Sequence, residues 1–574
     1  MIDYFSAGSR LYLTDFVDWE TYFRLRKGPD ADVEAEKAAL VEVLESAAGI
    51  CREIEAEARP NWHEEARLVD GKVVYPDHIR RGYEKLRDAG LICLGVREEY
   101  GGFDLPGLVN NMLLQMVARA DAGLMTLVGL QAGVAEDIQL YASEELKQQW
   151  LPRFVSGELM GAMDLTEPQA GSDLGAIVTR ATEENGEVFL DGNKIFITNG
   201  GCEVHLVLAR DADTFEQSRG TTRGLSLFLC PRHLPDGRPN GVKVLRLEEK
   251  LGIHGSPTAA IEFDHARAWR IGPKGEGFRC MLTLMNNARL GVAAQGVGIS
   301  EAALSAAIDY AKQRKQFGMP IYEQPLMKNI LARAALSLEG SRAVLYRACR
   351  LLDLNRAIER ALERGDLGEA EQAELQRTFE QNQTRVRLLT PLAKYLATES
   401  AIEITCEAIQ AHGGLGFMAE SEVGKLHLDA IITTIYEGTS EIQVSFALKE
   451  IGKGALIVAF DALAKELESI TEPPLVEYAD KVRHGIELIQ SAFEPLMQDM
   501  AYALMSAQSL AEVVTTVIAG AELLRQAQVS PERFDLAASW INRRMVDVRA
   551  RINRIKEGTV ARLDRCERVL SLMR

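Results

Sequence analysis

Hydrophobic and polar positions follow a helical period over most of the chain. Between residues 33 and 162, Ala, Glu and Leu recur at helical spacing, as in EAEKAALVEVLESAAGICREIEAEA, and Gly or Pro clusters separate the runs. Helical spacing returns at residue 276 and continues to residue 452. The pattern predicts helical domains over residues 33–162 and 276–452, preceded by an N-terminal extension of residues 1–32.

Between residues 163 and 275 the pattern changes to short β-type runs separated by turn signals. The run VFLDGNKIFITNGG contains Asp191-Gly192 and Asn199-Gly200-Gly201. Such pairs between β-type runs are the strongest short-range signal of a hairpin, so we expect hairpin turns at both places. A β domain over residues 163–275 is therefore predicted between the two helical domains.

Helical spacing also covers residues 453–574, which predict a C-terminal helical extension. Its most apolar stretch, Ala501 to Leu524, is interrupted by Gln508, Glu512 and Glu522, so it predicts a buried helix and no transmembrane segment. Residues 352–383, inside the second helical domain, are highly charged and predict an exposed helix–turn–helix insert. The predicted fold class is mainly α with a central β domain and a C-terminal helical extension.

Composition places the chain among ordinary globular proteins of two to four domains, with 574 residues, 47% of them hydrophobic and 26% charged. The net charge of -18 argues against a general nucleic-acid binder, because the surface would repel phosphates. Eight scattered cysteines without a CxxC pair predict buried free thiols in a reducing compartment. The first residues lack the features of a signal or transit peptide, so we expect a cytoplasmic protein, with a peripheral position at the inner membrane as an alternative.

Three segments combine Gly, hydroxyl and charged residues where packing alone would favour apolar ones. The first is MDLTEPQAGSDLGA, residues 163–176, whose Pro and Gly residues make an irregular backbone beside the hydroxyls of Thr166 and Ser172. Exposed amides and hydroxyls of this kind bind anions or the polar edge of a ring system. A capped loop without a ligand is the alternative.

The second segment is QAHGGLGF, residues 410–417, where the Gly pair allows close approach of a phosphate or simply ends a helix. The third is TTIYEGTSEIQ, residues 433–443, where Glu437 follows an apolar stretch and Thr439-Ser440 caps a new helix. A carboxylate in apolar surroundings has a raised pKa, as a general base requires. An ordinary glutamate at a helix end is the alternative for this segment alone.

In this order, these segments resemble the acyl-CoA dehydrogenase family from Tyr83 to Gly452. The other blocks that carry the resemblance are EEYGG (98–102), GNKIFITNGG (192–201), KLGIHGSPT (250–258), NNARLGVAAQGVG (286–298) and RKQFGMPI (314–321). The additions at both ends resemble a large bacterial subgroup, which includes 3-methylmercaptopropionyl-CoA dehydrogenases and broad-specificity fatty-acyl-CoA enzymes. The resemblance implies the family's fold of an α-bundle, a β-barrel or sandwich and a four-helix bundle, with FAD between the β domain and the second helical domain.

The resemblance also implies roles for individual residues. The positions around the isoalloxazine ring are Met163, Leu165, Thr166, Phe196 and Thr198, and Ser172 is a further cofactor-binding position. The positions that contact the rest of FAD are Arg314, Gln316, Phe317, Gln410, Gly413, Gly414, Thr439 and Glu441, with the residues of the 410–414 group reaching the cofactor of a neighbouring subunit. The positions near the thioester and the pantetheine arm are Ser172, Asn286, Arg289 and Gly438. No metal site is expected.

The implied reaction is α,β-dehydrogenation of an acyl-CoA. Glu437 removes the α-proton while a hydride leaves the β-carbon for flavin N5, which gives a trans-2-enoyl-CoA, and an electron-transfer flavoprotein then takes the electrons. The enolate needs hydrogen-bond donors at the carbonyl oxygen, and in the family these are the backbone N–H of the base and a ribityl hydroxyl of FAD. Some relatives carry the base at the position of Ala288, which cannot act as a base here.

Several alternatives remain open from the sequence. An acyl-CoA oxidase or an enoyl-CoA reductase would differ in electron partner or direction. From residue 541 onward there are ten Lys or Arg and four Asp or Glu, and an alkylation-response flavoprotein of the same superfamily binds DNA through such a region. A solvated or interface-paired helix face is favoured, so no nucleic acid is expected. We expect a homodimer, with a tetramer as the alternative, and Gly129, Gly133 and Ala288 favour room beyond a short acyl group.

The chain departs from the family pattern in two places. Ahead of the base loop, where most relatives have an Arg-Asp pair, it reads Lys425-Leu-His-Leu428-Asp429, which puts the local packing or a subunit contact in doubt. After RKQFG it reads Glu323-Gln324-Pro325, where relatives usually place a Gln.

Overall fold

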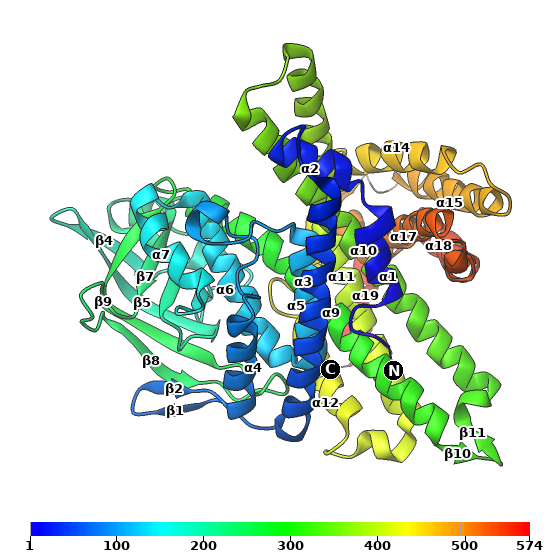
Figure 1. Cartoon of the computed structure of the whole chain (residues 1–574), viewed down its shortest axis with the longest axis horizontal. Helices are drawn as coiled ribbons and strands as arrows, with labels where there is room; N and C mark the ends of the chain where they lie inside the picture. The colour runs from blue at the N-terminus through cyan, green and yellow to red at the C-terminus, as the bar shows by residue number, and fades with distance from the viewer. Residues whose placement is uncertain (1, 494–495, 497–498, 574) are drawn as a thin grey trace. The chain divides into compact units, whose positions relative to one another are not determined.

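The computed structural model describes residues 2–493, 496 and 499–573 and divides into two compact units (Figure 1). The first, here called the sheet unit, contains Glu42–Gly291 and Gly424–Ile432. The second, here called the helical unit, contains Met1–Val41, Val292–Val423 and Thr433–Arg574. Helices predominate and one large sheet lies in the middle of the sequence, which confirms the predicted fold class.

Helices and a small hairpin form the first part of the sheet unit. They are α3 (Val33–Ala58, shared with the helical unit), β1 (Arg67–Val69), β2 (Lys72–Val74), α4 (Asp77–Asp88), α5 (Gly107–Ala120), α6 (Ala122–Tyr141) and α7 (Glu144–Val155). Asp121 separates α5 from α6 and accepts hydrogen bonds from the amides of Gly123 and Leu124, which satisfies the first free N–H groups of α6. Ser143 caps α7 in the same way through the amide of Leu146.

Seven strands follow in the sheet unit. They are β3 (Gly161–Asp164), β4 (Arg180–Glu184), β5 (Glu187–Thr198), β6 (Val204–Asp211), β7 (Leu225–Pro231), β8 (Val242–Leu247) and β9 (Thr258–Ile271). Their order is β3-β6-β4-β5-β9-β7, and β6 also pairs with β7, so five strands close into a ring. β8 pairs with β9 outside this ring. Buried side chains such as Leu190, Phe228 and Ile261 fill its core.

The two predicted hairpin turns are wrong. Asp191-Gly192 lies inside β5, where the pairing with β9 shifts between Leu190 and Gly192. A Cβ at Gly192 would come within 2.6 Å of Thr179 Oγ1, so this glycine allows a close approach instead of a turn. Asn199-Gly200-Gly201 joins β5 to β6, which do not pair with each other. The hairpin turn of β4 and β5 is at Asn185-Gly186, whose φ angles are both positive, as a two-residue turn requires.

The helical unit begins with α1 (Ala7–Leu11), a π-helical turn (Tyr12–Phe16) and α2 (Trp19–Lys27). Its long helices are α9 (Gly277–Gln313, shared with the sheet unit), α10 (Pro325–Arg364) and α11 (Glu369–His412). The small strands β10 (Lys315–Gln316) and β11 (Met319–Pro320) join α9 to α10. The remaining helices are α12 (Glu422–Thr433, mostly in the sheet unit), α13 (Ser440–Gly452), α14 (Ala455–Glu468), α15 (Leu475–Gln490), α17 (Met500–Val529), α18 (Phe534–Glu557) and α19 (Ala561–Ser571).

The charged residues 352–383 form the ends of α10 and α11 with a turn between them, so the helix–turn–helix prediction is confirmed for this segment. Only its tip is free of buried residues, from residue 362 to residue 381. Asp353, Ala357, Ile358 and Ala361 are buried, so the prediction of an exposed insert is wrong for the first ten residues. These residues continue the apolar face of α10, which the high charge of the segment concealed.

A buried ion cluster joins the two ends of the sequence to α10. Arg347 on α10 donates to Glu466 on α14 at 2.8 Å and to Glu522 on α17 at 2.7 Å. Tyr12, near the N-terminus, donates to the same Glu522 at 3.2 Å. Burial opposes charge on Glu466, yet the neighbouring arginines hold its pKa at about 2. The N-terminal extension and the C-terminal helices are therefore parts of one core.

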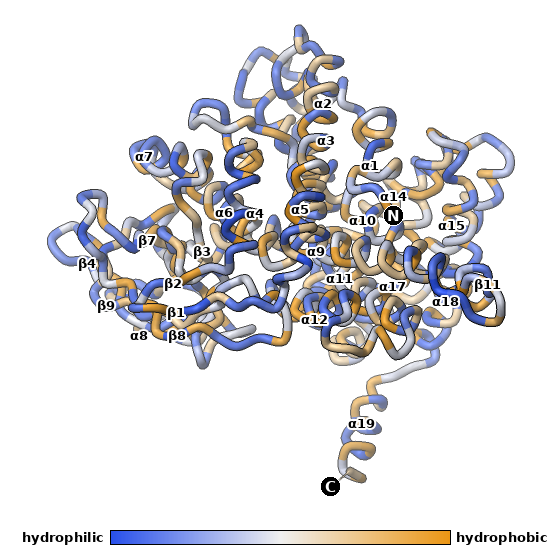
Figure 2. The backbone as a smooth tube through the Cα atoms, turned by 60° about the horizontal axis from the view of Figure 1, so that its bottom comes forward, coloured by the Kyte–Doolittle hydropathy of each residue, from blue (hydrophilic) through white to orange (hydrophobic). Residues whose placement is uncertain are grey.

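The C-terminal helices also contact α10 through Trp540 on α18. Its ring lies against Gly340, where a Cβ would come within 2.3 Å of the indole, and its Nε1 donates to the carbonyl of Thr516 at 3.1 Å. The last helix, α19, has no buried residue and extends away from the other helices of its unit (Figure 2). Apolar and polar positions alternate along it.

Two helices within the described residues are long and apolar enough to cross a membrane by length and composition, α9 and α17. Most of their apolar windows are buried, 89% and 67% respectively, as in the core helices of many globular proteins. All eight cysteines are free, and six are buried as predicted. Cys406 and Cys566 are exposed, so the prediction of buried thiols is wrong for these two.

We predict that Gly340→Ala destabilises the helical unit. The added methyl group collides with a rigid indole ring, and overpacking of this kind costs about 1–3 kcal/mol. Thermal unfolding followed by circular dichroism measures the effect. Gly49→Ala is the matched control, because Gly49 lies inside α3 with no atom within 4 Å of its added Cβ, and there the change stabilises slightly. Equal unfolding midpoints for Gly340→Ala and the wild type would contradict the packing role of this glycine.

Candidate active site

The residues that the sequence places at the active site fall into both units. The sheet unit contains Met163, Leu165, Thr166, Ser172, Phe196, Thr198, Asn286 and Arg289. The helical unit contains Arg314, Gln316, Phe317, Gln410, Gly413, Gly414, Glu437, Gly438, Thr439 and Glu441. Each group has its own local geometry.

A buried lysine organises the group in the sheet unit. Lys194 lies on β5 with its side chain fully buried, and its ammonium donates to the carbonyls of Leu165 and Leu208 and to Glu167 Oε1, all at 2.8–2.9 Å. Burial lowers the pKa of Lys194, whereas Glu167 raises it. Three acceptors around one ammonium replace its hydration shell, which a buried charge requires.

Glu167 extends this network to the loop that follows. Its carboxylate accepts hydrogen bonds from the backbone amides of Val178 at 2.8 Å and Thr179 at 3.0 Å. Burial opposes the charge of Glu167, but Lys194 and these donors hold its pKa below the usual range. The backbone of the Leu165–Glu167 turn is thus fixed from both sides, and Thr166 is half-buried at its centre.

Sequence reasoning did not assign a role to either of these residues. The available signal was a charged residue at an inward position of a β-strand, because Leu190 and Lys194 are both buried and lie on the same face of β5. An inward lysine in a strand indicates a buried partner.

Phe196 and Thr198 follow on the same strand. A second shift in the β5–β9 pairing lies between Lys194 and Ile197, and Phe196 adopts a φ of +59°. This bulge leaves the Phe196 ring 60% exposed next to the turn, whose Thr166 carbonyl accepts from the amide of Ile195 at 2.9 Å. An exposed aromatic ring beside a rigid polar turn fits the edge and face of a flavin ring.

The thioester positions of the sheet unit differ in burial. Ser172 is exposed in the loop after β3. Arg289 is buried on α9, and its Nη1 donates to Asn286 Oδ1 at 3.0 Å, three residues earlier on the same helix. The structure therefore brings Asn286 and Arg289 together.

In the helical unit, most of the positions predicted to contact the rest of FAD are on the surface. Arg314, Gln316 and Phe317 lie at the β10–β11 hairpin, where Phe317 is 90% exposed. Gln410, Gly413 and Gly414 lie at the end of α11 and in the 3-10 turn Gly413–Phe417, and all three are exposed. Gly413 has a φ of +61° and ends the helix.

The base loop lies between α12 and α13. Glu437 is half-buried and has a φ of +55°, and the next residue, Gly438, has a φ of +94°. A left-handed conformation in a residue other than glycine costs about 1–3 kcal/mol and persists only where its surroundings hold it. Thr439 caps α13, as predicted, by accepting from the amide of Ile442 at 3.4 Å, whereas Glu441 is exposed on the first turn.

Buried side chains hold the carbonyl groups of this loop. Gln443 Nε2 donates to the carbonyls of Glu437 at 2.9 Å and Gly438 at 3.0 Å, and Lys394 Nζ donates to Gly438 at 2.9 Å. Tyr436 donates to Gln295 on α9, and Ser440 donates to Glu399 on α11. Lys394 was not identified from the sequence, because nothing in the spacing relates α11 to the loop. Gln443 ends the segment TTIYEGTSEIQ, but no role was assigned to it.

The structure explains why the chain can have Lys425 and Asp429 where most relatives have an Arg-Asp pair. Lys425 forms an ion pair with Asp429 one turn later on α12, and its ammonium lies 4.7 Å from the centre of the Trp62 ring. Asp429 also accepts from the amide of Ile253 at 2.7 Å. The aspartate thus has a cationic partner without the arginine that most relatives place next to it.

Three domain models of one family match consecutive parts of the chain. They describe the N-terminal domain (residues 45–158), the middle domain (residues 162–266) and the C-terminal domain (residues 275–364 and 369–452) of acyl-CoA dehydrogenases. The chain belongs to the acyl-CoA dehydrogenase family. It is therefore an oxidoreductase that acts on acyl-CoA, and its cofactor is FAD. Exposed Phe196 and Phe317 provide apolar surface of the kind that a bound flavin nucleotide covers.

Individual relatives support this family assignment over most of the chain. A 3-methylmercaptopropionyl-CoA dehydrogenase of Ruegeria pomeroyi is 33% identical over 491 residues, which are 82% of this chain and 76% of the relative. The structure of Caenorhabditis elegans ACDH-11 in complex with C11-CoA has a TM-score of 0.77 at 23% identity, over 93% of this chain and 91% of that one. A Bacillus anthracis acyl-CoA dehydrogenase complexed with FAD has a TM-score of 0.72 at 22% identity, over 89% of this chain and 88% of that one. The last two show the same fold.

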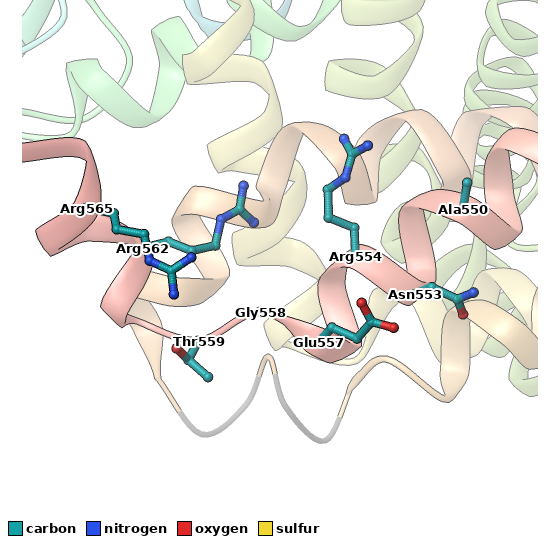
Figure 3. A pocket seen from close by; sticks show the side chains of 8 residues that line it. All are labelled: Ala550, Asn553, Arg554, Glu557, Gly558, Thr559, Arg562 and Arg565. Carbon is teal, nitrogen blue, oxygen red and sulfur yellow. The ribbon is translucent and has the colours of Figure 1, made fainter. Parts of the chain in front are cut away.

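A separate hollow lies at the C-terminal end of the helical unit. Its volume is about 450 Å³, and Arg554, Glu557, Arg562 and Arg565 are among the residues that line it (Figure 3). It contains none of the predicted site residues. Of the other basic residues here, Arg551 pairs with Glu512 at 2.5 Å and Arg544 donates to Ser337 at 2.8 Å. These two side chains are therefore paired within the helical unit.

We predict that Lys194→Met produces a folded protein that retains little FAD. Methionine fills the cavity but leaves the Leu165 carbonyl and Glu167 without their buried donor, so the turn at Thr166 loses its fixed geometry. The ratio of flavin absorbance to protein after gel filtration measures this loss. Lys243→Met is the matched control, because Lys243 lies exposed on β8 and pairs with Glu262 and Asp264 at the surface. Wild-type flavin content in Lys194→Met would show that the turn does not depend on this lysine.

Proposed function

We propose that this protein catalyses the α,β-dehydrogenation of an acyl-CoA to a trans-2-enoyl-CoA, with Glu437 as the base. The observation that carries the proposal is the conformation of the base loop. Glu437 is the first of the two carboxylates in the IYEGTSEIQ block, it is half-buried, and its left-handed backbone is held by side chains from the helix bundle. A backbone that stores strain in this way is common where a functional side chain needs one fixed direction.

The bound FAD supplies the hydride acceptor for this reaction. Glu437 removes the α-proton, and it must be ionised and shielded from water to do so. The backbone N–H of Glu437 provides one donor for the carbonyl oxygen of the thioester. The residues of the sheet unit, from Met163 to Thr198, hold the ring system, and Asn286, Arg289 and Gly438 position the thioester and the pantetheine arm.

The same proposal covers the location of the enzyme, its oligomeric state and its electron acceptor. We place it in the cytoplasm as a homodimer that passes electrons to an electron-transfer flavoprotein and takes part in fatty-acid β-oxidation. The exposed residues of the β10–β11 hairpin and of the Gly413–Phe417 turn support an oligomer. Phe317 and Phe417 are 90% and 84% exposed, and a second subunit would cover such rings.

We predict that Glu437→Gln abolishes flavin reduction by acyl-CoA. Glutamine preserves the size of the side chain and its hydrogen bonding but cannot accept the α-proton, so the rate of reduction falls by at least about 1,000-fold, within the range that the loss of a catalytic group produces. Anaerobic stopped-flow absorbance with a panel of acyl-CoAs of different length measures the rate. Glu420→Gln, an exposed change in the segment before α12, is the control. Full activity of Glu437→Gln would exclude this base, and a wild-type flavin that no acyl-CoA reduces would exclude the dehydrogenase.

We predict that the reduced enzyme reacts slowly with oxygen and rapidly with an electron-transfer flavoprotein. An oxidase would consume oxygen with acyl-CoA as the only other reactant, and an enoyl-CoA reductase would oxidise its reduced flavin with an enoyl-CoA faster than it reduces the flavin with the saturated thioester. An oxygen electrode and the two half-reactions, measured separately, distinguish the three enzymes.

A further inference from the structure

Lys394 is a buried cation that the reaction proposed above does not use. It lies in the middle of α11, its side chain is fully buried, and its ammonium donates to the carbonyl of Gly438 at 2.9 Å. This hydrogen bond joins two residues that are 44 positions apart in the sequence, and its acceptor is the residue that follows Glu437. Desolvating an ammonium costs several kcal/mol, so a buried lysine is retained where its contacts compensate for that cost.

The position of the contacted carbonyls explains what this lysine can do. The carbonyls of Glu437 and Gly438 belong to the two consecutive peptide planes that follow the base. Gln443 donates to both of them from α13, and Lys394 donates to the second from α11. A peptide plane held at its oxygen cannot rotate about its neighbouring dihedral angles, so the left-handed conformation of Glu437 and Gly438 is locked.

The direction of the Glu437 side chain depends on these planes. The Cβ atom is fixed by the backbone on either side of the Cα atom, and a right-handed Glu437 would direct its carboxylate elsewhere. The two side chains that hold this backbone are buried, since Lys394 and Gln443 are each 0% exposed. The hold is therefore formed within the helical unit.

We propose that Lys394 is a positioning residue for the catalytic base, and that together with Gln443 it clamps the Glu437–Gly438 backbone so that the carboxylate points at the α-carbon of the acyl-CoA. This inference rests on the proposed function, because it assumes that Glu437 is the base. It assigns to Lys394 no contact with the substrate or the flavin.

The test compares Lys394→Met, Gln443→Leu and the wild type, each purified with FAD bound. Anaerobic stopped-flow measurement gives the rate constant of flavin reduction at saturating acyl-CoA and, separately, the Kd of the acyl-CoA. A misdirected base slows proton removal but not binding, so the rate constant should fall by roughly 10- to 100-fold while the Kd changes by less than about 3-fold. Exchange of the α-proton with deuterium oxide, followed by NMR, should slow by a similar factor.

Thr398→Val is the matched control on the same helix. Thr398 is fully buried one turn after Lys394, but its hydroxyl donates to the carbonyl of Lys394 at 2.8 Å within α11 and does not bond to the loop. This variant should keep the wild-type rate, Kd and exchange. A similar loss in Thr398→Val and Lys394→Met would assign the effect to general loosening of α11 and overturn the positioning role.

The remaining outcomes also decide the question. Wild-type rates in both Lys394→Met and Gln443→Leu overturn the inference, while a wild type reduced by acyl-CoA leaves the proposed function intact. If no acyl-CoA reduces even the wild-type flavin, the proposed function itself fails. Should Lys394→Met not fold, Gln443→Leu provides the same measurement from the other side of the loop, and failure of both to fold makes the clamp structural and ends the proposal.

Discussion

A buried ammonium needs hydrogen-bond acceptors, and in this protein backbone carbonyls are among them at the two places where the site requires a fixed backbone. Lys194 holds the turn after β3 inside the strand ring, and Lys394 holds the loop before α13 inside the helix bundle. In each case the cation is tied to the main chain and not only to another side chain. A hydrogen bond to a backbone carbonyl restrains the peptide group itself, so the backbone dihedral angles of the flanking residues are restrained as well.

The sequence predicted the fold class well, because helical and strand periodicity differ strongly and change near residue 163. It predicted hairpin turns poorly. Asp191-Gly192 has the composition of a turn, but Gly192 serves the close approach of Thr179 to a strand, which depends on a contact distant in sequence. Asn185-Gly186 has the same composition and does form a turn, so composition alone could not separate the two.

The candidate site shows a similar division. The family blocks name Glu437, Thr166 and Phe196, because side chains that act on substrate or cofactor lie in recognisable segments. The residues that support them are not visible in this way, since Lys394 is 43 positions from Glu437 and lies in a helix whose pattern reads as ordinary core. Lys194 is part of the block GNKIFITNGG, but membership of the block gave it no role. Its inward position on β5 is what indicates a buried partner.

The ion cluster around Glu522 has a consequence for how the chain is made. Most of the sheet unit is one continuous stretch, from Glu42 to Gly291, and only Gly424–Ile432 joins it later in the sequence. The helical unit is assembled from three separate stretches, and Tyr12 near its start contacts Glu522 near its end. Part of the partner surface of the N-terminal residues exists once α10 has been made, since Ser9 bonds to Tyr346, but Tyr12 reaches Glu522 only when most of the chain has been synthesised. Until α17 has been synthesised, Tyr12 and Phe16 lack the contacts that Glu522 and Arg525 supply, which leaves apolar surface exposed on the growing chain.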